Sequence, residues 1–124
     1  MERDKVMANI LVVDDEQAIR TVTTRMVRRL GYETLEAPDG QAGVDLFATH
    51  ADKIACVLLD VTMPIMSGAQ ALVAMRRIQP AIPIILMSGY ASDDTAVRFA
   101  QLQPTGYLQK PFDAAELHAC LNAI

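Results

Sequence analysis

Short apolar segments alternate with segments of helical pattern five times along this chain, and this alternation constrains the fold more than any other feature of the sequence. The apolar segments, which we expect to be strands, are residues 9–13, 32–37, 54–60, 82–87 and 106–109. The expected helices follow them at residues 17–30, 41–49, 69–78, about 92–102 and 114–122. Strands and helices that alternate in this way form a parallel sheet through right-handed crossovers. The sequence therefore predicts an α/β fold with helices on both faces of a five-stranded sheet.

The composition fits one domain that needs neither disulfides nor a structural metal. The chain has 124 residues, and 52% of them are apolar, as suits a sheet that is covered on both faces. Residues 1–8 are polar and mixed in charge, so we expect a lead-in or linker there and the domain itself at residues 9–124. Cys56 and Cys120 lie in apolar surroundings and form no C-x-x-C motif, which favours buried, reduced thiols.

Charge and hydropathy limit the partners and the location of the protein. The net charge is −4, which argues against direct binding to nucleic acid, because neutralising phosphates requires clustered Lys and Arg. No segment has the length and apolarity of a membrane span, and no signal peptide is recognisable. We therefore expect a cytoplasmic protein without a membrane span in this chain.

The expected helix at residues 17–30 has a clear pattern. Its apolar residues Ile19, Val22, Met26 and Leu30 are spaced to share one face, which we expect to pack against the sheet. The arginines of this helix fall mostly elsewhere, and the simplest interpretation is that they form a solvated face.

Polar groups follow the expected strands at their carboxyl ends. They are Asp14 and Asp15, then Asp60, Ser88 and Lys110. Asp is common in turns and most lysines are solvated, so each residue taken alone has a simple structural explanation. In a parallel sheet, however, all carboxyl ends lie at one edge, where open α/β sheets bind ligands. The sequence therefore predicts that three carboxylates, a hydroxyl and an ammonium meet in one place.

This combination of groups suits phosphoryl transfer with a divalent metal. Carboxylates that crowd together repel each other unless a cation neutralises them, and Mg²⁺, or Mn²⁺ in its place, prefers oxygen ligands. A carboxylate beside such a metal and an ammonium can attack phosphorus. Lys110 would stabilise the charge on the phosphoryl group, and Ser88 could donate a hydrogen bond to it.

Four motifs in this order and spacing give the chain a clear family resemblance. They are VVDDE at residues 12–16, LDVTMPIMSG at residues 59–68, MSG at residues 87–89 and KPF at residues 110–112. The chain resembles the receiver domain of two-component response regulators over residues 10–124. The resemblance implies a flavodoxin-like, doubly wound sheet in the order 2-1-3-4-5, with the site at the switch between the first and third strands.

The resemblance also implies roles for the residues of the site. Asp60 would accept a phosphoryl group from the phosphohistidine of a histidine kinase or phosphotransfer domain. Asp15 and Asp60 would bind Mg²⁺ directly, Asp14 would act mainly through water, and Thr62 would offer its backbone carbonyl. Lys110 would contact the phosphoryl group.

Other roles that the resemblance implies concern switching and lifetime. Ser88 and Tyr107 occupy the two switch positions, although Tyr107 taken alone could be a half-exposed strand aromatic. Thr62 and Tyr90 occupy positions that tune the lifetime of the phosphoryl group, and our hypothesis is that bulky Tyr90 slows hydrolysis. The Lys110–Pro111 peptide bond is expected to be cis. Phosphorylation would then bias a partner-binding or self-association face formed by residues 92–102, 106–109 and 114–122.

Two other functions are compatible with parts of this pattern. A haloacid-dehalogenase-like phosphatase also uses an Asp nucleophile with Mg²⁺, but it normally carries a second Asp two residues later, where this chain has Thr62 after Asp60. A phosphorylation-independent interaction module could share the fold, although it would not need the full set of site residues. A receiver is not a conventional enzyme, but residues 87–90 and 108–112 resemble receivers of hybrid sensor histidine kinases, whose full-length proteins are kinases. A stand-alone regulator remains the alternative to such a parent.

Overall fold

The computed structural model describes residues 8–61, 63, 66–89 and 102–124. The strands are β1 (Asn9–Val13), β2 (Glu33–Ala37), β3 (Ile54–Asp60), β4 (Ile84–Ser88) and β5 (Gly106–Gln109). The α-helices within these ranges are α1 (Gln17–Arg29), α2 (Gly40–His50), α3 (Gly68–Ile78) and α5 (Ala114–Asn122), and a 3-10 turn, η2 (Ala51–Lys53), precedes β3. The fourth predicted helix, at about 92–102, lies outside the described residues except for its last position, as do residues 1–7 of the predicted lead-in.

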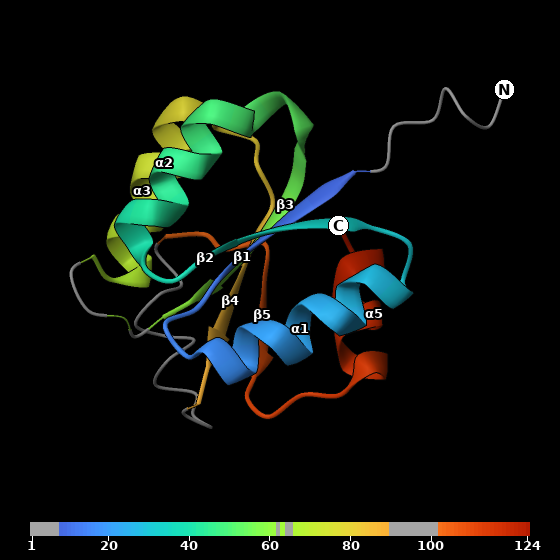
Figure 1. Ribbon diagram of the computed structural model, residues 1–124. Helices are drawn as coiled ribbons and strands as arrows, with labels where there is room; N and C mark the ends of the chain where they lie inside the picture. Colours follow the sequence, from blue (N-terminus) through green and yellow to red (C-terminus); the bar gives the residue numbers. More distant parts are fainter. Residues whose placement is uncertain (1–7, 62, 64–65, 90–101) are drawn as a thin grey trace, which may run out of the picture.

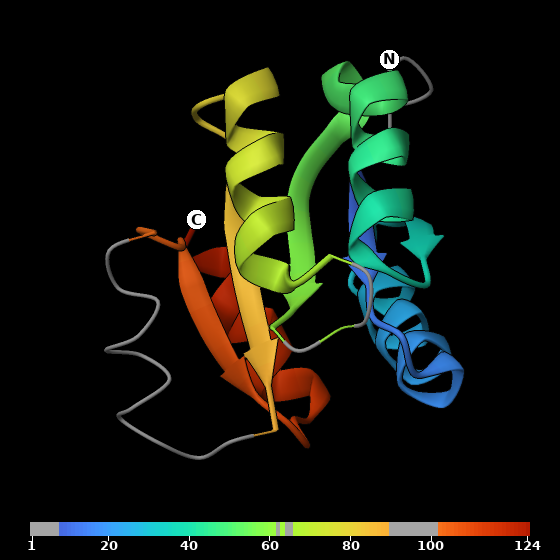
Figure 2. The same cartoon turned by 90° about the vertical axis from the view of Figure 1, so that its left-hand side faces the viewer.

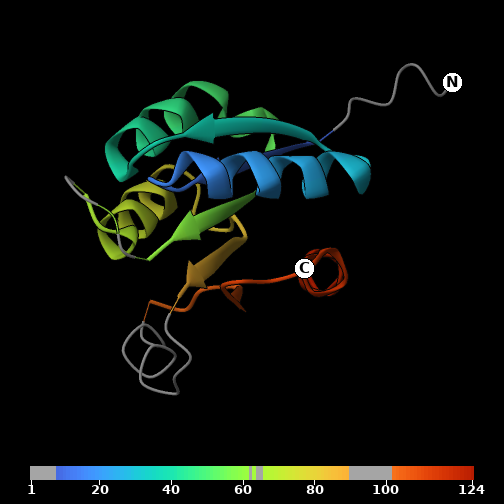
Figure 3. The same cartoon turned by 60° about the horizontal axis from the view of Figure 1, so that its bottom comes forward.

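All strands of the sheet are parallel, and their order is β2-β1-β3-β4-β5. This confirms the predicted doubly wound topology. The helices α2 and α3 cover one face of the sheet, and α1 and α5 cover the other (Figure 1). The strand arrowheads point toward one edge of the molecule, so the carboxyl ends lie together there (Figures 2 and 3).

The core consists of two apolar layers, one on each face of the sheet. Leu11 of β1 is fully buried in a cluster that includes Phe47 of α2 and Met75 of α3. Its neighbour Ile10 is buried in a second cluster with Leu117 of α5. Successive strand residues point to opposite faces, so a strand with both faces covered must be apolar at every position. The continuous apolar runs of the sequence therefore have a direct structural cause.

Local sequence signals set the helix ends close to the predicted ones. Asp39 caps α2 by accepting from the backbone N–H of Ala42 at 2.8 Å. Ser67 and Asp113 each form a capping box at the start of α3 and α5. Gly31 has φ of 100°, a left-handed conformation that suits glycine beyond a helix end. Within the described residues, none of the helices is both long and apolar enough to cross a membrane.

Two predictions about these elements need correction. The strand predicted at residues 82–87 begins later, at Ile84, because Pro83 has no N–H to donate to a sheet ladder, and it ends with Ser88. The predicted inner face of α1 is also partly wrong, since Val22 is 49% exposed. The buried residues of α1 are Thr23, Thr24 and Val27, so the helix is rotated relative to the predicted orientation.

Candidate functional site

The polar groups at the strand ends meet at the carboxyl edge of the sheet. Asp14 follows β1 directly, and Asp60 and Ser88 are the last residues of β3 and β4. All three are buried, with Asp14 fully inaccessible, whereas the neighbouring Asp15 is exposed. Asp14, Asp15 and Asp60 each place a carboxylate oxygen within 4.8 Å of the others. The acidic cluster therefore has both a buried part and a part that faces solvent.

Lys110 joins this acidic cluster from the end of β5. Its Nζ lies 2.7 Å from Oδ2 of Asp14 and 3.3 Å from Oδ1 of Asp60. The backbone N–H of Lys110 donates to the carbonyl of Ser88 at 2.7 Å, which ties the residue to the end of β4. The Lys110–Pro111 peptide bond is cis. One ammonium thus contacts two carboxylates that come from different strands.

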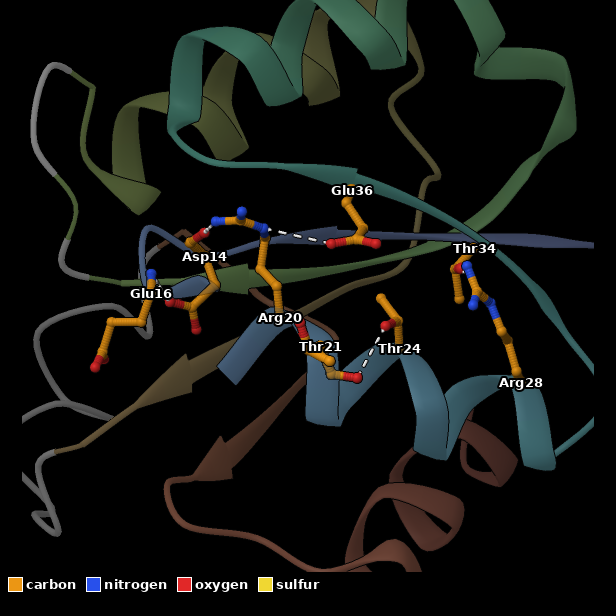
Figure 4. A network of polar contacts seen from close by, with 8 residues as sticks. All are labelled: Asp14, Glu16, Arg20, Thr21, Thr24, Arg28, Thr34 and Glu36. Carbon is orange, nitrogen blue, oxygen red and sulfur yellow. Dashed lines mark hydrogen bonds and ion pairs between the residues drawn. The ribbon is translucent and has the colours of Figure 1, made fainter. Parts of the chain in front are cut away.

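Asp14 is held firmly at the end of β1. Its backbone N–H donates to the carbonyl of Ala37 at 3.1 Å, at the end of β2. Its Oδ1 accepts from the backbone N–H of Glu16 at 2.9 Å, and its own carbonyl accepts from Arg20 Nη1 at 2.8 Å (Figure 4). With Oδ2 directed at Lys110, every polar group of Asp14 has an assigned partner.

The backbone around Asp60 is fixed by close packing against the start of α3. The N–H of Gly68 donates to the carbonyl of Val61 at 3.1 Å, and the N–H of Val61 donates to the carbonyl of Met87 at 2.9 Å. A Cβ at position 68 would collide with the Asp60 carbonyl and would lie 2.9 Å from Val61 Cα. Glycine at this position therefore permits the close approach of the α3 backbone to the acidic residue.

Burial and charge shift the titration of the central residues. Burial raises the pKa of Asp60 to about 6 from an ordinary 3.8, against the lowering effect of the Lys110 ammonium, and the Asp14 carboxylate raises it further. Burial works to lower the pKa of Lys110, but the hydrogen bond to Asp14 and the nearby Asp60 charge leave it raised. Lys110 is thus charged at neutral pH. The carboxylates of Asp14, Asp15 and Asp60 together still outnumber this one ammonium.

This donor set fits a hard divalent cation. Three carboxylates share one ammonium, which leaves an excess of negative charge in a partly buried place. Oxygen ligands and incomplete neutralisation are what Mg²⁺ and Mn²⁺ require in protein sites. Because Asp15 is exposed, a metal held by this cluster would keep contact with solvent and with an arriving ligand.

The remaining predicted residues are placed as follows. Tyr107 lies on β5, paired with Leu86 of β4 in the register of the sheet, and packs partly buried against the α2–α3 layer. Burial raises the pKa of its hydroxyl. Thr62 and Tyr90, which were assigned the backbone metal ligand and the lifetime positions, lie outside the described residues.

Two features of the site were missed by sequence reasoning. Arg20, predicted to belong to a solvated face, is largely buried and bonds to Asp14. An apolar groove of about 110 Å³ lies beside Lys110, between α1 and the segment after β5, and Val22 and Phe112 are among its lining residues. The position of Arg20 one turn into the helix that follows Asp14 and Asp15 is the only sequence signal that could have indicated its role.

A parallel sheet with helices on both faces, and with buried aspartates and a lysine at its carboxyl edge, is typical of signalling domains that accept a phosphoryl group on aspartate. Residues 10–122 match the family "Response regulator receiver domain", and the chain belongs to this family. The match does not favour a haloacid-dehalogenase-like phosphatase.

Individual relatives agree with this assignment. The chain is 40% identical over 110 residues to "Regulatory protein AtoC" of Escherichia coli, covering 88% of this chain but only 23% of AtoC. The receiver domain of sensor histidine kinase PA1611 from Pseudomonas aeruginosa, solved with a magnesium ion in its active site cleft, has a TM-score of 0.84 at 29% identity, covering 94% and 95% of the two chains. A response regulator protein from Burkholderia pseudomallei, solved with a phosphorylated aspartic acid, a calcium ion and citrate, has a TM-score of 0.81 at 30% identity, covering 94% and 68%.

Proposed function

We propose that Asp60 is the phosphoacceptor of this receiver domain and that its phosphorylation requires Mg²⁺. The observation that carries the proposal is the convergence of Asp14 and Asp15, from the end of β1, and Lys110, from the end of β5, on Asp60 at the end of β3. The donor is the phosphohistidine of a histidine kinase or phosphotransfer domain. A phosphorylated aspartate in the Burkholderia relative and a magnesium ion in the PA1611 receiver support the assignment.

Each residue of the site has a separate role in the phosphoryl transfer. A carboxylate oxygen of Asp60 attacks phosphorus as the bond from phosphorus to the donor nitrogen breaks, and the imidazole leaves with the electron pair of that bond. Lys110, already within 3.3 Å of Asp60, stabilises the charge on the phosphoryl oxygens. Asp15, Asp60 and the Thr62 carbonyl would hold Mg²⁺ directly and Asp14 mainly through water, and the bound ion would supply positive charge that stabilises the transferring phosphoryl group.

The phosphorylated state acts through the edge of the sheet formed by β4 and β5. In this proposal Ser88, buried at the end of β4, moves toward the phosphoryl group, and Tyr107 on the adjacent strand moves inward. The segment 92–102, β5 and α5 then present a changed surface to a downstream protein or to a second copy of the chain. β5 leads directly to Lys110 of the site, which supports this output face.

The apolar groove beside Lys110 is the surface we assign to the phosphodonor domain. Ile19, Val22 and Met26 line one side of it, and Pro111 and Phe112 the other. Val22 is 49% exposed, so the groove offers apolar surface to a partner directly beside Lys110. A donor domain bound in this groove would bring its phosphohistidine close to Asp60.

The wider setting of the domain is also part of the proposal. The chain spans a small part of the curated relatives it matches, 23% of AtoC and 12% of the sensor kinase CckA from Brucella abortus. It serves as a receiver in a cytoplasmic protein, either a regulator or a hybrid kinase, and needs no nucleic-acid contact of its own. The domain extends over residues 9–124.

The test uses acetyl phosphate as a small phosphodonor. The purified chain is incubated with acetyl phosphate, with and without Mg²⁺, and its intact mass is followed. We expect a single added phosphoryl group that depends on Mg²⁺ and is lost in Asp60→Asn. A chain that stays unmodified while a known receiver is labelled under the same conditions would favour the phosphorylation-independent module.

A further inference from the structure

Arg20 occupies a position that the proposed phosphotransfer does not yet use. Its side chain is only 15% exposed, and its Nη1 donates to the carbonyl of Asp14 at 2.8 Å. Its Nε lies 3.4 Å from Oε1 of Glu36 on β2. Figure 4 shows the guanidinium lying between the end of β1 and the neighbouring strand. One planar group thus connects α1, β2 and the acidic end of β1.

The carbonyl that Arg20 holds belongs to the peptide bond between Asp14 and Asp15. The other groups of Asp14 are already fixed by Ala37, Glu16 and Lys110. A bond to this carbonyl therefore fixes the plane of the peptide that leads to Asp15. Because Asp15 itself is exposed, surrounding packing constrains its carboxylate little, and the orientation of its backbone helps to direct it.

We infer that Arg20 is a positioning residue, which orients the Asp14–Asp15 peptide so that the Asp15 carboxylate meets those of Asp14 and Asp60 at the metal. The inference rests on the proposed function, since it concerns how the same acidic cluster binds Mg²⁺. Groups that hold metal ligands in place typically contribute 10- to 100-fold to metal affinity.

Charge and orientation act in opposite directions at Arg20. A guanidinium near a cation site repels the cation, so its removal alone would strengthen metal binding. Here, however, Glu36 pairs with the guanidinium, which leaves the Arg20–Glu36 pair close to neutral. The bond to the Asp14 carbonyl is short and largely shielded from solvent, so loss of orientation outweighs loss of charge.

The same helix supplies a matched control. Arg28 also reaches from α1 to β2, where its Nε donates to Oγ1 of Thr34 at 2.9 Å, but this contact is exposed and distant from Asp14 in the chain. Figure 4 shows the two arginines at opposite ends of the helix. Arg28→Met therefore removes a link between α1 and β2 without touching the peptide that carries Asp15.

The experiment measures Mg²⁺ affinity by calorimetry for the parent, Arg20→Met, Arg20→Lys and Arg28→Met. We expect Arg20→Met to bind about 10-fold more weakly, Arg20→Lys roughly 3-fold more weakly, and Arg28→Met within about twofold of the parent. Arg20→Lys keeps the positive charge but loses the planar guanidinium, so it carries the test if Arg20→Met does not fold. The rate of labelling by acetyl phosphate gives a second readout: in Arg20→Met it recovers at saturating Mg²⁺.

Each outcome decides the inference. Unchanged or tighter Mg²⁺ binding in Arg20→Met, or in Arg20→Lys if Arg20→Met does not fold, overturns the inference, while labelling of Asp60 in the parent keeps the proposed function. Equal losses in Arg20→Met and Arg28→Met also overturn it, because they indicate a general effect of helix packing. A parent that neither binds Mg²⁺ nor accepts phosphate overturns the proposed function and the inference together.

Discussion

The amine of Lys110 lies 3.3 Å from Oδ1 of Asp60, although Asp60 is the last residue of β3 and Lys110 follows β5. The same amine contacts Asp14 at 2.7 Å, so it neutralises part of the charge that a metal would otherwise neutralise. We predict that Lys110→Met lowers the rate of phosphorylation by acetyl phosphate by about 100-fold or more, since removal of one preorganised charge-stabilising donor has this effect in other sites.

Metal binding separates this role of Lys110 from a structural one. The ammonium competes with a cation for the same carboxylates, so Lys110→Met should bind Mg²⁺ at least as tightly as the parent. Calorimetry on both proteins measures this. Loss of Mg²⁺ binding together with loss of labelling would indicate that the site has collapsed, and would contradict the role assigned to the lysine.

The raised pKa of Asp60 predicts how stability depends on pH in the absence of a divalent metal. Between its ordinary value of 3.8 and about 6, the folded chain holds a proton on Asp60 that the unfolded chain has released. The contribution of Asp60 to the stability of the folded chain therefore becomes less favourable as pH rises through this window. We predict that Asp60→Asn stabilises the metal-free protein by on the order of 1 kcal/mol at pH 7 and has little effect at pH 4, after allowance for solvent screening.

Urea unfolding at the two pH values, with the metal removed by chelator, measures this difference. Adding Mg²⁺ at pH 7 should stabilise the parent more than Asp60→Asn, because the ion offsets the repulsion that the substitution relieves. An Asp60→Asn variant that is less stable than the metal-free parent at pH 7 would show that the carboxylate is not under electrostatic strain.

Gly68 permits the close contact between α3 and the backbone of Asp60 and Val61. A methyl group there would overlap with backbone atoms, which cannot move aside as a flexible side chain could. We predict that Gly68→Ala destabilises the protein by about 2 kcal/mol and slows labelling of Asp60, since it displaces the strand end. Gly89→Ala is the control, because a Cβ at Gly89 meets none of the residues that the structure describes within 4 Å. Similar unfolding midpoints for the two variants would contradict this account of the contact.

The exposed Val22 allows a test of the donor surface. Val22→Glu places a charge in the apolar groove beside Lys110, so we predict that transfer from a phosphotransfer domain that labels the parent slows by roughly 10-fold. Labelling by acetyl phosphate should be unaffected, because this small donor needs no protein contact. Val73→Glu, an exposed valine on α3 across the sheet, is the matched control. If Val22→Glu slows labelling by acetyl phosphate as well as by the phosphotransfer domain, or if Val73→Glu slows transfer to the same extent, the groove is not the docking surface.

The fold and the strand-end residues could be predicted because both follow from local rules. Apolar runs that alternate with helices dictate a parallel sheet, and a parallel sheet brings its carboxyl ends together. The close approach of Asp14, Asp60 and Lys110 could therefore be predicted from the sequence alone. The family resemblance then supplied the strand order, which periodicity alone does not contain.

The roles of Arg20 and Val22 depend on information that the sequence pattern does not hold. Successive residues of a helix lie about 100° apart around its axis, so a small rotation of α1 on the sheet exchanges buried and exposed positions. Packing of Thr23 and Val27 sets this rotation, and it exposes Val22 while burying most of Arg20. Such a rotation follows from the shape of the whole core rather than from the order of apolar residues.

The most direct test of the central claim identifies the residue that carries the phosphoryl group. Borohydride reduces an acyl phosphate to an alcohol, so an aspartyl phosphate becomes homoserine, which peptide sequencing by mass spectrometry locates. After treatment with acetyl phosphate and Mg²⁺, we predict homoserine at position 60 and nowhere else, and none when the metal is chelated. Homoserine at position 14 or 15 instead, or label that persists in Asp60→Asn at the parental level, would contradict the account.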